Sequence, residues 1–371
     1  MIDTICLLIP RNQITFLSGA SSWELYSKTD QYKKYIRNPS KIEKETGKYF
    51  PRLTDYDRGF QQVENVRIEF SAPKLLFLNN LDELEEKDFQ KVIKTLQERL
   101  FVMGVVIPAT ILEDASVSSV HFSKNIRLED GYTSNYIISE MNKVNLNKKF
   151  DFTRSRYIND GQSLYAHTTA HQLIIYDKTA DLGKDKKRAI DKDQTHYQME
   201  LFNLLQKNHE LNEILRIEVR LNHKQKLNKL LINLGYQKNP TFRQVFNKEI
   251  SRKVITYYWT ELIKGRNFGT FSITLSAKDI LQTLFLTNPR LKPKQATYLL
   301  GLFILAKDEK GIRQLRTIFS HRARDRTWYR IAKDIRLAGE LITKNRVRDW
   351  VIQIDKALET FISYKTNINE K

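Results

Sequence analysis

The chain has few of the residues that support secreted or membrane proteins. Among its 371 residues, Cys6 is the single cysteine. One thiol cannot form a disulfide within the chain or build a cysteine zinc site, which favours a reducing compartment. No apolar run reaches the roughly 18 residues that a membrane helix needs. The apolar start, Met1 to Pro10, is too short for a signal peptide. The sequence therefore predicts a cytoplasmic protein that does not enter a membrane.

Two common catalytic motifs are also missing. The chain has no glycine-rich phosphate loop, so nothing supports nucleotide hydrolysis. It also lacks the His-hydrophobic-His pattern of one large class of nucleases. Any nuclease chemistry must therefore use another arrangement of side chains.

Acidic residues are scarce, most of all in the last third of the chain. The formal charge is +19, from 62 Lys and Arg against 43 Asp and Glu. Residues 1–240 carry 36 basic and 31 acidic residues, a net +5, and residues 241–371 carry 26 and 12, a net +14. Because basic and aromatic residues interleave there, we expect a polyanion, DNA, as the partner. A basic protein without a specific partner is the plain alternative.

Four stretches have the alternation of β-strands. They are 66–70, 118–122, 173–178 and 215–219. Each has apolar residues on one face and a reactive polar residue on the other, since side chains alternate along a strand. If the strands share one sheet, these polar residues meet on one surface.

The wider pattern predicts an α+β fold. Strands and helices are mixed through 1–240, with an amphipathic helix at 86–103 and a hairpin turn at 159–161. We expect an antiparallel sheet backed by helices, forming a metal-dependent nuclease domain over 1–240. Beyond it, 241–371 should form a basic, mainly helical DNA-binding domain. The predicted helices there are 241–264, 276–286, 293–307, 309–320, 326–342 and 347–363.

Three strand residues together suit a divalent metal ion. Glu69, His121 and Glu218 offer two carboxylates and one imidazole, a set that suits Mg²⁺ or Mn²⁺. Each has a simpler interpretation when taken alone. Glu69 is a solvated strand residue, His121 an ordinary histidine, and Glu218 a salt-bridge partner of its neighbours Arg216 and Arg220. The prediction depends on their shared face.

Tyr176 is the candidate nucleophile. It lies on the expected polar face of its strand, with Lys178 two residues on, where an ammonium could stabilise phenolate or phosphate charge. Tyrosine needs such help because its ordinary pKa is near 10. Tyr157 and Tyr165 are rival nucleophiles. With a metal, these parts fit phosphoryl transfer through a phosphotyrosine.

The densest basic and aromatic stretch is 321–330. If it is helical after Asp325, Arg326 and Arg330 lie one turn apart on one face. Arginines there would bind phosphates or guanine edges, and an aromatic ring would stack on unpaired bases. An amphipathic helix with a buried Trp328 is the alternative. The predicted DNA contacts are Arg322, Arg324, Arg326, Trp328 and Arg330.

The chain resembles the replication initiators of the filamentous-phage gene II/X type, which occur in phages and plasmids. The resemblance rests on several short motifs in order: an apolar strand after Met1-Ile2-Asp3; Glu69-Phe70-Ser71-Ala72-Pro73-Lys74, with Asn79-Asn80 after it; Val117 to His121; Ile174-Ile175-Tyr176-Asp177-Lys178; and Leu215 to Arg220. It covers 1–225 and returns weakly at 326–330. His121 stands where some relatives have an acid.

The resemblance implies rolling-circle replication. Such an enzyme nicks one strand of a double-stranded origin, keeps the 5′ phosphate on a tyrosine, here Tyr176, and later rejoins the ends. Glu69, His121 and Glu218 would hold Mg²⁺ or Mn²⁺, and Lys178 would assist. Double-stranded origin DNA, single-stranded DNA, a host polymerase and a helicase would be its partners. A conjugative relaxase and a non-enzymatic origin- or operator-binding protein are the alternatives.

Overall fold

The computed structural model describes most of the chain, with several gaps. The described residues are 1–17, 23–28, 33–57, 65–129, 132–142, 154–158, 163–182, 201, 203, 213–263, 276–307, 311–320, 325–342 and 349–366. Arg322, Arg324 and the predicted turn at 159–161 lie outside them. Within this part of the chain, no helix is both long and apolar enough to cross a membrane.

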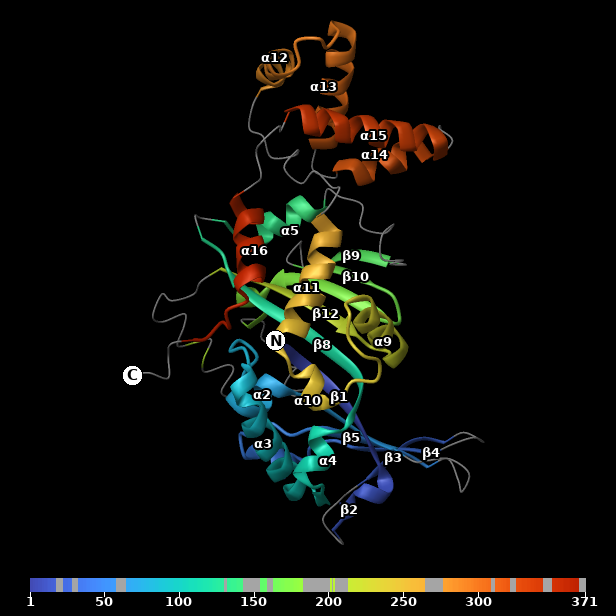
Figure 1. Ribbon diagram of the computed structural model, residues 1–371, viewed down its shortest axis with the longest axis vertical. Coiled ribbons are helices and arrows are strands. Elements are labelled where there is room, and N and C mark those ends of the chain that lie inside the picture. Colours follow the sequence, from blue (N-terminus) through green and yellow to red (C-terminus); the bar gives the residue numbers. More distant parts are fainter. Residues whose placement is uncertain are drawn as a thin grey trace.

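Ten strands of the described residues form one antiparallel sheet (Figure 1). All four strands expected from the alternation lie in it, and the two strands on either side of the predicted hairpin turn pair with each other. The predicted antiparallel sheet is therefore confirmed. In spatial order the strands are β3 (Glu24–Lys28), β4 (Lys33–Arg37), β5 (Arg52–Asp57), β6 (Asn65–Ser71), β1 (Ile2–Pro10), β8 (Ser116–Arg127), β12 (Ile214–Leu221), β11 (His171–Asp177), β10 (Ser163–His167) and β9 (Arg154–Ile158). A second sheet pairs β2 (Thr15–Phe16) with β7 (Val105–Val106).

The sheet has one apolar face, which helices cover. On β12, Leu215, Ile217 and Val219 are all fully buried, in step with the alternation. Helix α3 (Phe89–Val102) packs Val92, Leu96 and three more apolar residues at helical spacing into the same core. Burying one such side chain stabilises the fold by about 1.5–3 kcal/mol. Leu96→Ala would cost about 2–5 kcal/mol, because a cavity would remain.

Further helices cover the apolar face along the rest of the sheet. α2 (Ala72–Phe77) contacts β1 and β6, and α9 (Lys224–Asn233) contacts β8 and β12. α11 (Lys248–Ile263) crosses β8 and β12 as Figure 1 shows. α4 (Ala109–Glu113), α5 (Ser134–Asn142) and α10 (Phe242–Val245) complete this layer. The other face of the sheet carries polar side chains such as Arg216 and Glu218 of β12, which alternate with its buried apolar residues.

The helices of the last third pack in two groups. α12 (Ala277–Thr287), α13 (Pro293–Lys307), α14 (Gly311–Ser320) and α15 (Asp325–Ile342) contact one another and enclose two small cores. These four helices lie together at one end of the molecule (Figure 1). α11 and α16 (Asp349–Thr360) instead join the large core of the sheet. The division at residue 240 stays a prediction, yet the apolar packing continues past it into α11 and returns to the sheet with α16.

Candidate active site

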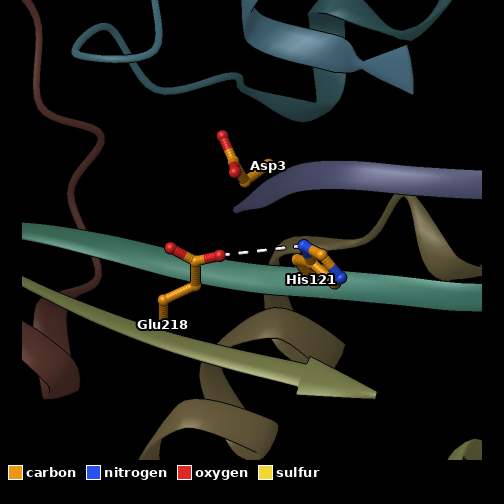
Figure 2. Close-up of side chains that lie close together, drawn as sticks. All are labelled: Asp3, His121 and Glu218. Atoms are coloured by element: carbon orange, nitrogen blue, oxygen red, sulfur yellow. Dashed lines mark ion pairs between the residues drawn. The ribbon is translucent and has the colours of Figure 1, made fainter. Parts of the chain in front are cut away.

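Side chains from three neighbouring strands converge on the polar face of the sheet (Figure 2). They are Asp3 of β1, His121 of β8 and Glu218 of β12. One ligand atom of each lies within 4.8 Å of the others, and His121 Nδ1 is 3.7 Å from Glu218 Oε1. Among the described residues this is the group of carboxylates and imidazoles that could hold a metal ion. The sequence placed His121 and Glu218 correctly on a shared face.

Asp3 reaches this face because β1 has an irregular register. Ile2 pairs with Phe122 and Ile5 with Val120, so three steps along β1 match two along β8. An extra residue of this kind reverses the alternation of faces. Ile5 and Ile2 therefore both pack in the core, and Asp3 between them turns to the polar face. A strict alternation from Ile5 would have put Asp3 in the core, and that is why the sequence analysis missed it.

Glu69 is not part of this group. It is exposed on β6, where it pairs with Cys6 of β1 and Arg52 of β5. β1 and β8 separate β6 from β12, so three steps of about 4.8 Å put Glu69 and Glu218 at least roughly 14 Å apart. The charge of Glu69 raises the pKa of His121 less than the charges of Glu218 and Asp3 do. The candidate metal group thus contains Asp3 where the sequence analysis expected Glu69.

Arg216 fixes both carboxylates from within the sheet. It is 1% exposed, its Nη2 lies 2.9 Å from Asp3 Oδ1, and its Nε lies 3.8 Å from Glu218 Oε2. The guanidinium also donates to the Asn80 carbonyl at 2.7 Å and to Ser123 Oγ at 3.0 Å. Arg220 donates from Nε to Glu218 Oε1 at 2.7 Å. The predicted salt bridges of Glu218 exist: the one with Arg216 is buried, and the one with Arg220 joins the buried carboxylate to a side chain that is 34% exposed.

Tyr176 lies beside Glu218. It pairs with Arg216 across β11 and β12, and its hydroxyl donates to Glu218 Oε2 over 3.5 Å. Burial raises the pKa of the Tyr176 phenol well above its usual value, against the opposing charge of Arg216. The phenol is therefore protonated at neutral pH, and Glu218 Oε2 accepts its hydrogen bond.

Lys178 is buried next to the tyrosine. It follows β11 as the first residue of α6 (Lys178–Leu182), and its Nζ lies 5.8 Å from the centroid of the Tyr176 ring. Nζ donates to Asn80 Oδ1 at 2.8 Å and to Asp181 Oδ2 at 3.3 Å. Burial lowers the pKa of Lys178 to about 8, although Asp181 favours the charged form. Near neutral pH the ammonium still contributes positive charge to the site.

The rival tyrosines differ in what the structure shows. Tyr165 lies on β10, one strand beyond β11, and its ring stacks 4.8 Å from the His167 ring. Tyr157 is on β9, at the edge of the sheet, and its side chain lies outside the described part of the structure. His171 is buried on the apolar face, where its Nδ1 is 2.7 Å from the Tyr258 hydroxyl. Of the three tyrosines considered from the sequence, Tyr176 is the one that the described part of the structure shows in contact with Glu218.

The donor set fits a divalent cation. Asp3 and Glu218 supply oxygens and His121 a nitrogen, a mixture suited to Mn²⁺ or, with added water, Mg²⁺. Asp3 Oδ1 is buried near Arg216 without a hydrogen bond of normal geometry. Burial lowers the pKa of His121, although Glu218 raises it, so the imidazole is neutral and has a lone pair to offer. The residues of the site therefore fit an ion.

The charge on Asp3 is strongly favoured. Burial opposes ionisation, but Arg216, Lys178, His121 and Lys74 outweigh it and hold the pKa of Asp3 at about 2. The carboxylate thus stays charged at any pH near neutrality, as a metal ligand must.

The predicted DNA contacts on α15 are only partly exposed. Arg326 and Arg330 are exposed and lie one turn apart. Trp328 is 7% exposed and packs 6.2 Å from Phe319 in a core of the helical unit. Its assignment to a base-stacking surface was wrong, because the apolar face of an amphipathic helix takes the tryptophan inward. The neighbouring Tyr329 is exposed instead.

Comparisons with protein-family models, with curated proteins and with solved structures gave no match.

Proposed function

We propose that the chain is a metal-dependent, site-specific DNA endonuclease and strand transferase with Tyr176 as its nucleophile. The observation that carries the proposal is the contact of the Tyr176 hydroxyl with Glu218, whose other oxygen faces His121. The nucleophile and a candidate metal group thus share one carboxylate. This combination is what a phosphotyrosine mechanism requires.

The chemical step is a displacement at phosphorus. The Tyr176 oxygen forms a bond to the phosphorus, and the bond from phosphorus to the 3′ oxygen breaks. Glu218 Oε2, which accepts the Tyr176 hydrogen bond, would take the phenolic proton, and the departing 3′ oxygen would take a proton from water. A divalent cation held by Asp3, His121 and Glu218 would neutralise charge on the phosphate and the leaving oxygen.

Two cations of the chain support the same step. Lys178 places its ammonium beside the Tyr176 ring, where it would favour developing negative charge. Arg216 does not move freely, because Asn80, Ser123 and Asp3 all hold it. It orients Asp3 and Glu218, so that the ligand atoms are in place before DNA binds.

The biological role we propose is that of a rolling-circle replication initiator of the filamentous-phage gene II/X type. The order of the motifs through 1–225 supports it. Helices α12–α15, with exposed Arg326 and Arg330, would bind the double-stranded origin, while the sheet acts on the exposed single strand. A polymerase and a helicase of the host would then extend the freed 3′ end. A conjugative relaxase would carry out the same chemistry on a different DNA.

The test is formation of a covalent protein–DNA adduct. The purified protein is incubated with a pool of single-stranded oligonucleotides from its own replicon and Mn²⁺ or Mg²⁺. We expect a species that survives denaturation and is lost on chelation. Tyr176→Phe should abolish it, a loss on the order of 10³-fold or more, and leave DNA binding intact.

Tyr165→Phe is the matched control, since it removes a hydroxyl one strand away and should retain the adduct. If Tyr176→Phe cleaves as well as the unchanged protein, Tyr176 is not the nucleophile. If DNA binds but no adduct forms with either ion, the non-enzymatic binding protein becomes the better proposal.

A further inference from the structure

The strand order of the large sheet is the same when followed outward from its centre in either direction. In each half, the first strand along the chain lies at the centre of the sheet. The second lies at the outer edge, and the next three follow inward, so that the fifth strand pairs with the first. The two series are β1, β3, β4, β5, β6 and β8, β9, β10, β11, β12. The central strands pair antiparallel, as a two-fold axis through the sheet requires. Helices that cover the same apolar face follow each series.

The register extends this likeness to single residues. β6 carries Arg67-Ile68-Glu69 and β12 carries Arg216-Ile217-Glu218, the same three residue types in the same order. Glu69 pairs with Cys6 on its central strand, and Glu218 pairs with Ser123 on the other. The isoleucine between them is buried in both strands.

The same register shows what the first half has in place of the active site. Arg67 pairs with Thr54 where Arg216 pairs with Tyr176, so a threonine stands at the nucleophile position. Ser71 and Arg220 each lie two residues after the glutamate of their strand. Ser71 pairs with Thr4 and Arg220 pairs with His121, so Thr4 occupies the position of His121. The first half therefore retains the arginine and glutamate but has neither the phenol nor the imidazole.

The polar face of this first half carries cations beside aromatic rings. Lys34 Nζ lies 4.4 Å from the Tyr26 ring centroid and 5.9 Å from that of Tyr56. Tyr26 is 66% exposed, and Arg52 is exposed next to half-buried Arg67. Glu24 and Glu69 are exposed on the same face. Alternating cations and rings of this kind bind single strands through phosphate contacts and base stacking.

We infer that β1 with β3–β6 is a second, non-cleaving copy of the half that carries the active site, and that its polar face binds the single strand that the active site cuts. This inference rests on the proposed function. A two-fold axis perpendicular to the sheet keeps equivalent residues on one face, so the strand would run from Tyr176 across β8 and β1 toward Thr54, Lys34 and Tyr26. The ligand class is single-stranded nucleic acid, contacted through phosphates and bases.

Length-dependent binding tests the inference. Affinity is measured without metal for single strands of about 6 and about 20 nucleotides that share the cut site. The unchanged protein should bind the longer strand at least tenfold more tightly. Lys34→Gln with Arg52→Gln should remove most of this gain. The same double variant should also have a shallower slope of log K against log salt for the longer strand. We expect a change of about 1.4, because each of two lost phosphate contacts contributes about 0.7.

The control is Lys91→Gln with Lys94→Gln, the same loss of charge on the exposed side of α3, behind the apolar face. It should leave the gain unchanged. If the gain and the slope persist in the Lys34 and Arg52 variant, the strand leaves the site by another route and the inference fails. If that variant proves unstable, Tyr26→Ala at the exposed edge must reduce the gain instead.

Adduct formation on the short strand separates this inference from the proposed function. We expect the Lys34 and Arg52 variant to form the adduct on the short strand as the unchanged protein does. If the adduct forms but the longer strand binds no more tightly than the shorter one, the strand-binding role of the first half is contradicted and the proposed function is not. A length-dependent gain with no adduct contradicts Tyr176 chemistry alone.

Discussion

The two halves of the sheet have the same topology, yet their polar faces differ in burial and in chemistry. In the second half, Arg216 and Glu218 are both 1% exposed and are joined to Asp3, His121 and Tyr176. In the first half, Arg67 is half-buried and Glu69 is exposed, with neutral threonines nearby. The Arg-x-Glu pair alone does not make a site. What differs is the tyrosine and the histidine around it, and the burial that strengthens each electrostatic contact.

The largest expected difference concerns the two glutamates. Glu218→Gln removes a carboxylate of the proposed metal group and the oxygen proposed to accept the Tyr176 proton. We expect the rate of adduct formation to fall on the order of 10³-fold, equivalent to about 4 kcal/mol of transition-state stabilisation. The equivalent change in the first half, Glu69→Gln, should alter the rate less than about twofold. Single-turnover kinetics with excess protein measures both. Equal losses in the two variants would mean that Glu69 also belongs to the catalytic group.

The two arginines should differ in stability. Arg216→Met leaves the buried carboxylates of Asp3 and Glu218 without their shared partner, and breaking such a buried pair costs about 3–5 kcal/mol. Arg67→Met removes a half-buried group that donates to Cys6 Sγ, so the cost should be about 1 kcal/mol or less. Urea unfolding of both variants gives the comparison. A cost of Arg67→Met equal to that of Arg216→Met would show that both halves depend on a buried network.

The smallest of these effects appears in acid. The pKa of Asp3 is about 2 in the folded protein and near 3.8 when unfolded, so the ionised form stabilises the fold at higher pH. This contribution, about 2 kcal/mol, is complete above the unfolded value and is lost as the pH falls through about 2. Asp3→Asn should therefore flatten the fall of the unfolding free energy between pH 4 and pH 2. Asp57→Asn, at a half-buried position in the first half, should not. An Asp3→Asn curve as steep as that of the unchanged protein contradicts the assignment.

The sequence predicted the parts of the site that depend on regular alternation. Tyr176 and Glu218 lie on the polar face because β11 and β12 keep period two, and His121 does so because β8 alternates from Val120 to Phe122, beyond an irregular pairing near Val117. Helix α3 follows its apolar spacing. Asp3 was missed because a bulge in β1 reverses its face. Glu69 was wrongly included because alternation gives a face but not a position in the sheet, and two strands separate it from Glu218. The buried role of Arg216 depends on Asn80, which is distant in sequence and reaches it only in the folded chain.

One feature of the sequence matches the repeated strand order of the sheet. Arg-Ile-Glu occurs at 67–69 and again at 216–218, in two stretches that both alternate as strands. Three residues are too few to establish a repeat without the register that the structure supplies. The burial of Trp328, by contrast, needs no structure to be recognised, because the amphipathic pattern of α15 in the sequence already indicates it.

The most direct test of the account is to find the residue that carries the DNA. The adduct formed with Mn²⁺ is digested with protease and nuclease, and the peptide that retains a nucleotide is identified by mass spectrometry. The account predicts a phosphodiester link at Tyr176, in the peptide that holds β11. A link at Tyr165, Tyr56 or any residue other than Tyr176 would contradict it.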